Sequence, residues 1–278
     1  MAVTGLTDAD VVFLRDIIFR RSAIVLDESK DYLIETRLEK LAHDLNYGNL
    51  ALLVADVRRD QGTVTRQLIE ALTTHETLFF RDVRPFEALK REIMPPLIAA
   101  RQATKQLTIW SAACSTGQEV FSVAMMLKEN FPDTLSWPVK LYATDISGQV
   151  IERARQGKFQ QLEVNRGLPA AMLVKYFERD GVDWKIKEDI RKMVRFEQLN
   201  LLHAWPFDLR PDVVLLRNVL IYFNTQTKKE ILARVRQVLK PDGVLLLGSA
   251  ETTLGIDEGW ERAPGAVTPW YRLARSGG

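Results

Sequence analysis

Hydrophobic residues recur at every third or fourth position through the first seventy or so residues, and this spacing predicts amphipathic helices. Thr7 and Ser29 stand before two of the apolar stripes and are expected to cap the helices that begin there. We therefore predict a small all-helical N-terminal domain over residues 1–73. Its main apolar stripes are Val11, Leu14 and Ile18, followed by Ile34, Leu38, Leu41 and Leu45.

The pattern changes twice after this domain. Residues 74–105 contain three of the eleven prolines and read as a linker around one helix, from Phe86 to Met94. From residue 106 to 278, short apolar runs alternate with helical spacing, which is typical of a mostly parallel sheet covered on both faces. The predicted strands are 107–110, 139–144, 196–200, 212–216 and 244–248, with a strand pair between 260 and 273 as an antiparallel edge.

One interval interrupts this alternation. Residues 176–195 contain an Asp-Gly turn followed by alternating apolar and polar residues, which predicts a small antiparallel β-subdomain inserted into the sheet domain. Such an insert serves either to recognise a partner or only to elaborate the fold. The chain as a whole is thus predicted to be an α/β protein with a helical N-terminal domain and a small β insert.

Composition narrows the function classes. Lys and Arg total 38 against 36 Asp and Glu, so a net charge of +2 gives no global electrostatic case for nucleic acid or an anionic membrane. His43, His75 and His203 lie far apart, and we expect no metal site. The first eight residues carry no leader pattern and no apolar run is long enough to span a membrane, so we expect a cytoplasmic protein. Cys114 is the single cysteine, which suits a reducing compartment.

The most informative run extends from Trp110 to Glu119, where a predicted buried strand passes directly into a helix. Its small residues let a ligand approach the backbone, and the start of a helix offers free N–H groups and a positive dipole end. Ser115 and Thr116 are predicted to cap this helix. Only one glycine stands where a dinucleotide fingerprint has three, so an ordinary tight turn remains an alternative. Cys114 is either a small filler in this loop or a reactive thiol.

The next strand supports a cofactor site. Asp145 ends that strand, 28 positions after Gly117, and an acidic residue there can accept both ribose hydroxyl protons. Ser147 is then expected to cap a helix that closes at Gly157. Together the two signals favour a nucleotide-like cofactor at the ends of these strands over the alternative that Asp145 only starts a turn before Ser147 and Gly148.

Five segments, spread over almost the whole chain, together carry a family resemblance. They run from Thr73 to Asp82, Trp110 to Glu119, Ala143 to Ile146, Asn200 to Leu202 and Arg217 to Phe223. In this order they resemble the signature blocks of CheR chemotaxis methyltransferases, which use S-adenosyl-L-methionine to methylate glutamates on the cytoplasmic helical bundle of bacterial chemoreceptors. The resemblance implies a helical domain followed by a Rossmann-like methyltransferase domain over 106–278, with S-adenosyl-L-homocysteine as product.

The same resemblance implies cofactor contacts on every block. Asp145 is expected to hold the ribose, Asn200 to lie at the adenine edge, and Arg217 beside the methionyl part. His75 stands where the family usually has asparagine, and Gln118 where acids are common. The full implied set is His75, Thr77, Arg81, Ala113, Gly117, Glu119, Asp145, Ile146, Asn200, Leu201, Arg217 and Asn218.

The chemistry that the resemblance implies needs no strong base. A glutamate carboxylate, with an ordinary pKa of about 4.3, is already ionised near neutrality, so positioning and exclusion of water should dominate methyl transfer. Arg81 and Tyr222 are the expected catalytic residues. Arg81 either holds the cofactor carboxylate or steers the substrate glutamate by paired hydrogen bonds. Tyr222 places its ring or hydroxyl near the sulfonium, with packing under the fourth strand as the alternative. Phe79 and Phe80 are expected to pack in the core.

Two further expectations concern partners. Lys30, Arg37 and Lys40 share one flank of a predicted helix, which is either a docking face for acidic receptor helices or an ordinary solvated flank. Some family members tether to a pentapeptide at the receptor's C-terminus through an extended loop in the β-subdomain. The short turn from Arg179 to Asp183 predicts no such pentapeptide binding.

Two other functions remain open from the sequence. One is methylation of another carboxylate or of a small molecule, and the other is a regulatory module that only binds the cofactor. Nucleic-acid methylation is disfavoured, because the strand before Arg217 lacks the Asn/Asp-Pro-Pro-aromatic run that grips an extruded base.

Overall fold

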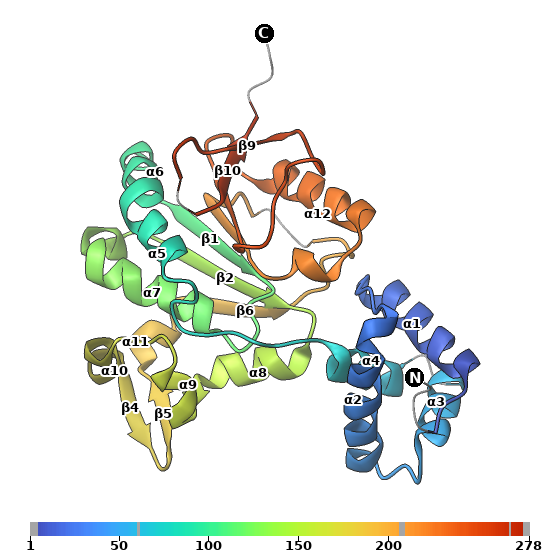
Figure 1. Ribbon diagram of the computed structural model, residues 1–278. Helices are drawn as coiled ribbons and strands as arrows, with labels where there is room; N and C mark the ends of the chain where they lie inside the picture. Colours follow the sequence, from blue (N-terminus) through green and yellow to red (C-terminus); the bar gives the residue numbers. More distant parts are fainter. Residues whose placement is uncertain (1–4, 60–61, 206–208, 267, 275–278) are drawn as a thin grey trace. The chain divides into compact units, whose positions relative to one another are not determined.

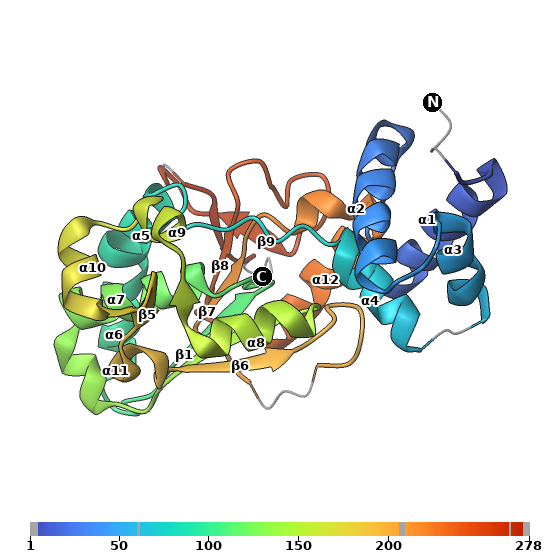
Figure 2. The same ribbon diagram turned by 90° about the horizontal axis from the view of Figure 1, so that it is seen from below.

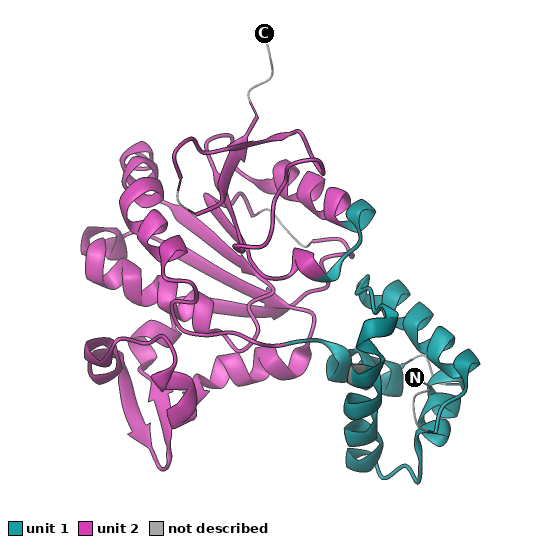
Figure 3. Ribbon diagram, in the orientation of Figure 1, with its two compact units in different colours: residues 1–74, 222–227 teal, residues 75–221, 228–278 magenta. Residues whose placement is uncertain are grey.

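The computed structural model describes residues 5–59, 62–205, 209–266 and 268–274 (Figure 1). The chain divides into two compact units, one of residues 1–74 with 222–227 and one of residues 75–221 with 228–278 (Figure 3). Residues 1–4, on which part of the prediction of no leader peptide rests, lie outside the described residues. No helix within the described ranges is both long and apolar enough to cross a membrane.

The first unit is helical, as predicted. It contains α1 (Asp8–Ser22), the short η1 (Glu28–Lys30), α2 (Asp31–Asp44), α3 (Leu50–Arg59) and α4 (Thr63–Leu72). The predicted stripes of α1 and α2 meet in its core, together with apolar residues of α3 and α4. This packing stabilises helices of only ten to fifteen residues, which are marginal in isolation.

One of the two predicted caps in this unit is correct. The Thr7 hydroxyl accepts the Asp10 N–H at 3.2 Å, and the Asp10 carboxylate accepts the Thr7 N–H in return, which completes a capping box on α1. The prediction for Ser29 is wrong. Ser29 lies inside η1, whose cap is Asp27, and α2 begins at Asp31 without a side-chain cap.

Arg37, on the predicted docking flank, connects α2 to the end of α4. One of its terminal nitrogens donates to the carbonyls of Leu72 at 2.8 Å and Thr73 at 3.0 Å, and the other donates to the Thr74 hydroxyl at 3.2 Å. The last carbonyls of a helix lack partners within it, so this guanidinium satisfies them. Lys40, by contrast, makes an exposed pair with Asp44 one turn away on α2.

The helix predicted from Phe86 to Met94 is longer than expected. It runs as α5 (Arg84–Ala88), a π-helical turn η2 (Leu89–Ile93) and α6 (Met94–Ala100), so Pro95 and Pro96 do not end it. The π turn changes the hydrogen-bond spacing just before the prolines, and they then occupy the first positions of α6, where a backbone N–H is not needed. The sequence rule that proline stops a helix therefore failed here.

The second unit contains the predicted mixed sheet, with strand order β6-β2-β1-β7-β8-β10-β9. The first five of these strands are parallel, and β10 pairs antiparallel with both β8 and β9, which confirms the predicted edge. The bounds are β1 (Leu107–Ala112), β2 (Val139–Asp145), β6 (Val194–Gln198), β7 (Val213–Leu216), β8 (Val244–Leu247), β9 (Trp260–Arg262) and β10 (Trp270–Leu273).

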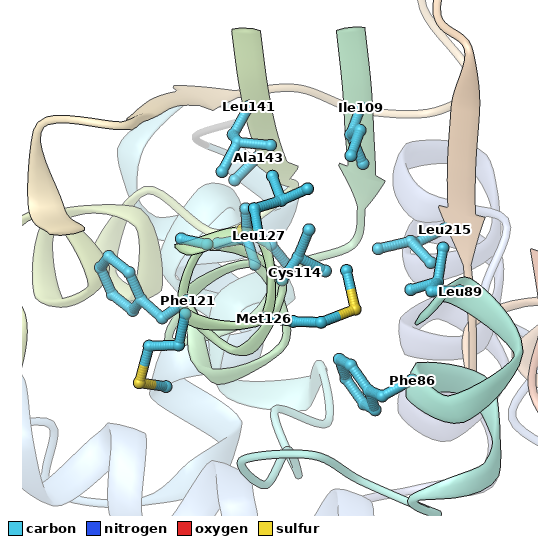
Figure 4. Packing of buried hydrophobic residues seen from close by; sticks show 14 of the residues in the cluster. Phe86, Leu89, Ile109, Cys114, Phe121, Met126, Leu127, Leu141, Ala143 and Leu215 are labelled. Carbon is cyan, nitrogen blue, oxygen red and sulfur yellow. The ribbon is translucent and has the colours of Figure 1, made fainter. Parts of the chain in front are cut away.

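Helices cover this sheet. Alternate strand residues such as Ile109, Leu141 and Leu215 join one buried cluster with residues of α5, α7 (Gln118–Asn130) and α8 (Gly148–Gln156). Figure 4 shows these three side chains beside α7 and α5, and α8 runs along β6 (Figure 2). The intervening residues of each strand point to the opposite face. The helix α12 (Thr225–Val238) connects β7 to β8, and these two strands continue the sheet on the side of β1 that faces away from β2. Because crossovers between parallel strands are right-handed, α12 covers this opposite face of the sheet. Short η3 (Pro132–Ser136) and η4 (Leu220–Tyr222) complete the connections.

The predicted β insert is present, but one of its three strands lies before the predicted range of residues 176–195. Its sheet has the order β3-β5-β4, and β3 precedes residues 176–195. A strand of two residues shows no alternation that sequence reading can detect. Phe159 and Phe177 of this sheet pack edge-on against the fully buried Phe79, at ring distances of 5.0 and 5.6 Å. The elements are β3 (Lys158–Phe159), α9 (Gln161–Asn165), α10 (Ala170–Tyr176), β4 (Phe177–Asp180), β5 (Asp183–Ile186) and α11 (Glu188–Arg191).

The contacts of Arg37 give a stability prediction for the helical unit. Arg37→Ala is expected to lower the free energy of unfolding by about 1–3 kcal/mol, because the carbonyls at the end of α4 lose their donors. Lys40→Ala is the matched control and is expected to leave stability nearly unchanged, since its ion pair is exposed. Urea unfolding followed by circular dichroism measures both, and equal losses would contradict the structural role of Arg37.

Candidate functional site

The predicted cofactor residues gather at one edge of the sheet. Strands β1, β2, β6, β7 and β8 are parallel, so their carboxyl ends and the loops that follow them lie at the same edge. Nine of the twelve implied cofactor contacts lie at this edge: seven in the loops after β1, β2, β6 and β7, Asp145 at the end of β2, and Glu119 in the first turn of the helix α7 (Gln118–Asn130). The other three, His75, Thr77 and Arg81, lie on the segment that leads into α5.

The loop between β1 and α7 has an unusual backbone. Ala113 has a φ of 62°, Ser115 of 52° and Gly117 of 93°, all in the left-handed region. A Cβ on Gly117 would lie 3.0 Å from the Phe121 ring and 3.2 Å from the Ala154 side chain, so the backbone conformation favours glycine there and the space beside it is tight. Residues without glycine's freedom adopt such a backbone only where the surroundings enforce it, and such places are common at ligand sites.

The predicted caps of α7 are wrong. Gly117 is the N-cap residue and has no side-chain cap bond. The Ser115 hydroxyl donates to the carbonyl of His75 at 2.8 Å, and the Thr116 hydroxyl donates to the Gln118 side chain at 2.7 Å. The N-terminus of α7 therefore lacks a side-chain cap, which is the arrangement that favours a polar or anionic ligand group.

Asp145 connects two of these loops. Its carboxylate is 6% exposed and accepts the Ser115 N–H at 2.8 Å and the Ser147 N–H at 3.1 Å. Burial raises the pKa of Asp145, while these backbone hydrogen bonds and the charge of the His75 imidazole oppose the rise. The Ser147 hydroxyl accepts the Val150 N–H and caps α8, and Gly157 closes that helix with φ 64°, so both predictions are confirmed.

Arg217, after β7, is the most enclosed charge of the site, with a side chain 1% exposed. It donates to Glu119 at 2.8 Å, to Asp82 at 2.7 Å and to the carbonyl of Arg81 at 3.0 Å. Glu119 also accepts the Ser111 hydroxyl at 2.8 Å. Glu119, expected as a cofactor acid, is thus bound to Arg217, and this pair joins α7 to the loop after β7.

The segment before α5 is held by backbone contacts. Arg81 donates to the carbonyl of Glu76 at 2.8 Å, and the Phe80 N–H donates to the Ser122 hydroxyl at 2.9 Å. Phe80, Asp82 and Val83 all have positive φ. Phe79 is fully buried and Phe80 packs on the same cluster, which confirms that they are packing residues. Thr77 lies half-buried in this segment.

The loop after β6 contains Asn200 and Leu201. The Asn200 side chain accepts the Leu202 N–H at 2.9 Å, and the carbonyl of the buried Leu201 accepts from Arg234 at 2.5 Å. Arg234 lies on α12 and was not predicted, because an arginine in an amphipathic helix reads as solvent-facing. Ile146, after β2, connects to the same region through its carbonyl, which accepts from the Gln198 amide at 2.9 Å.

A second unpredicted residue, Glu251, follows β8. Its buried carboxylate accepts the N–H groups of Asn218 at 2.8 Å and Val219 at 2.9 Å. Asn218 itself has a φ of 57°. The sequence signal that pointed to β8, a run of apolar residues, ended at Gly248 and gave no reason to examine Glu251.

Tyr222 is the last residue of η4 and clusters with the helical unit, where its carbonyl accepts the Val25 N–H at 2.9 Å. Arg81, the other expected catalytic residue, belongs to the sheet unit.

Cys114 is buried in the core. Its burial and the nearby charges of Asp145 and Glu119 raise the pKa of its thiol well above the ordinary value, which supports the interpretation of Cys114 as a small filler. Across the described ranges, no group of three or more His, Cys, Asp or Glu side chains is placed to hold a metal ion.

Comparison with known proteins identifies the family. The model of the CheR methyltransferase all-alpha domain matches residues 9–73, and that of the CheR methyltransferase SAM binding domain matches residues 75–266. Chemotaxis protein methyltransferase 1 of Pseudomonas aeruginosa is 38% identical over 268 residues, which cover 94% of this chain and 97% of that protein. Chemotaxis protein methyltransferase Cher2 of Pseudomonas putida is 37% identical over 252 residues, 88% of this chain and 91% of that protein. The chain belongs to the CheR family of S-adenosyl-L-methionine-dependent chemotaxis methyltransferases.

Proposed function

We propose that this protein methylates glutamate side chains on the cytoplasmic helical bundle of chemoreceptors and that it works in the cytoplasm. The observation that carries the proposal is the buried Arg217, held by Glu119 and Asp82 at the carboxyl edge of the sheet in a chain of this family. The reaction would form a methyl ester on the receptor and release S-adenosyl-L-homocysteine.

The residues at this edge fit the cofactor. The Arg217 Nε is buried and has no hydrogen-bond partner among the described residues, so a donor remains for the methionyl end. Asp145 uses its two oxygens for one backbone N–H each, and a carboxylate has further lone pairs for ribose hydroxyls. Ala113 and Gly117 have no side-chain atom beyond a Cβ, so no large side chain covers the backbone at these two positions of the loop after β1. We assign the adenine edge to Asn200 and Leu201.

The proposed chemistry depends on orientation. Bound S-adenosyl-L-methionine supplies a methyl group on a sulfonium. The receptor carboxylate is ionised near neutral pH, so these residues need only align it and exclude water. We assign the first task to Arg81, which uses one of its five N–H groups on the carbonyl of Glu76 and has others for a carboxylate. We assign Tyr222 to the transition state, through its ring or hydroxyl.

Radiolabelled cofactor tests the substrate directly. Incubation of the protein with methyl-labelled S-adenosyl-L-methionine and cytoplasmic receptor fragments is expected to place label on glutamates of the methylation helices, as esters that release methanol in base. Peptide mapping locates the label. Labelling of a small molecule, or of other residues, would overturn the proposal, and cofactor binding without transfer to any fragment would favour a regulatory module.

A substitution at Tyr222 separates catalysis from binding. Tyr222→Phe and Tyr222→Ala are expected to lower kcat more than they lower cofactor affinity, because contacts made only in the transition state change the rate. Tyr32→Phe, at an exposed tyrosine of α2, is the matched control. Turnover of the alanine variant equal to the wild type at saturating cofactor would show that Tyr222 is a packing residue.

We further propose that receptor recruitment does not use a C-terminal pentapeptide. Asp180 and Asp183 pair across β4 and β5, so the connection is the two-residue turn Gly181-Val182, and Gly181 has a φ of 66°. This turn offers no loop to wrap an added peptide strand. Titration of a free receptor pentapeptide is expected to give no heat, and receptors without that tail are expected to be methylated as well as those with it. Saturable micromolar binding would overturn this assignment.

A further inference from the structure

The carboxylate of Glu251 lies among four backbone donors from two loops. It accepts the N–H groups of Asn218 at 2.8 Å, Val219 at 2.9 Å and Ile221 at 3.3 Å in the loop after β7. It also accepts the Gly248 N–H at 2.7 Å, at the end of β8. A single side chain thereby satisfies three backbone N–H groups in the four residues that follow Arg217, the last of them inside η4.

The backbone around Glu251 leaves little alternative to this arrangement. Asn218 has a φ of 57°, which L-residues other than glycine rarely adopt without external support. A Cβ on Gly248 would lie 2.7 Å from the Glu251 carboxylate and 2.8 Å from the Asn218 amide. Because Gly248 has no side chain, the loops after β7 and β8 approach each other closely. The Glu251 carboxylate then accepts hydrogen bonds from backbone N–H groups of both loops.

Glu251 also borders an open cavity of about 490 Å³ beside the site. Asp82, the partner of Arg217, lines the same cavity, together with Arg84, Thr252 and Tyr271. A cavity of this size admits water, so the four donors can be solvated if the carboxylate is removed. Loss of Glu251 should therefore leave the fold intact while it releases the geometry of the loop after β7.

We propose that Glu251 is a positioning residue of the methyltransferase site, which acts through the backbone from Asn218 to Ile221 to orient Arg217. This inference rests on the proposed function only where it concerns turnover. The effects of replacing Glu251 on S-adenosyl-L-homocysteine affinity and on the loop after β7 can be measured without a receptor substrate. Glu251 is not a catalytic residue, because its carboxylate is committed to protein N–H groups.

The test compares Glu251→Gln with Glu258→Gln, an exposed glutamate later in the same segment. The amide keeps the shape of Glu251 but presents one acceptor oxygen and no charge to four donors. We expect Glu251→Gln to weaken S-adenosyl-L-homocysteine binding at least fivefold by calorimetry and to lower kcat at least tenfold. Hydrogen exchange should accelerate at Asn218, Val219 and Ile221 and stay slow within β7 and α12. The control should match the wild type in each measurement.

The outcomes separate positioning from general stability. Unchanged affinity, kcat and local exchange in Glu251→Gln would overturn the inference, and so would faster exchange spread evenly over the sheet. If the glutamine variant does not fold, Glu251→Asp takes its place, because it keeps the carboxylate on a side chain that is one methylene shorter. Faster hydrogen exchange confined to Asn218, Val219 and Ile221 in that variant supports the inference, and its absence overturns it. If the wild-type protein binds S-adenosyl-L-homocysteine but methylates no receptor, the proposed function is wrong. The hydrogen-exchange and affinity results for Glu251 remain valid in that case.

Discussion

The buried guanidinium of Arg217 sets the constraint that the rest of the site satisfies. A positive charge with 1% exposure is costly unless carboxylates and carbonyls surround it. Its partners come from α7, through Glu119, and from the segment before α5, through Asp82 and the carbonyl of Arg81. Satisfying one charge therefore brings three distant stretches of chain to the carboxyl edge of the sheet, where a cofactor has to bind.

Backbone strain is concentrated around the same charge. Among the non-glycine residues with positive φ, Asp82 is an acidic partner of Arg217, and Phe80 and Val83 lie within two residues of Asp82. Asn218 directly follows Arg217, and Ala113 and Ser115 shape the loop before α7. Each such residue costs about 1–3 kcal/mol, and the surrounding packing has to supply that energy. The large cluster of β1, β2, β7, α5 and α7 supports these stretches, because it holds Phe79 and α5 on either side of residues 80–83, β1 and α7 on either side of residues 113–117, and β7 before Asn218.

Arginines with structural roles show where reading by residue type fails. Arg37 on α2 and Arg234 on α12 both lie in amphipathic helices, where a charged residue is expected to face water. Each instead donates to carbonyls: Arg37 to the end of α4, and Arg234 to Leu201 in the loop after β6. The hydrophobic pattern determines which face of a helix is buried, but it does not say which long polar side chain reaches an unsatisfied carbonyl elsewhere.

The sequence by itself determined the main elements of both units and their order. Periodicity predicted the helical domain, the parallel strands and the antiparallel edge, and Gly117 and Asp145 marked two loops of the site, because burial and backbone conformation restrict residue type locally. Only the tertiary structure decided what Glu119 binds, that Ser115 and Thr116 do not cap α7, that β3 joins the small sheet, and that Glu251 supports the loop after β7. Those outcomes depend on partners far away in the chain, and a carboxylate or hydroxyl in the sequence does not reveal which distant donor or acceptor it will meet.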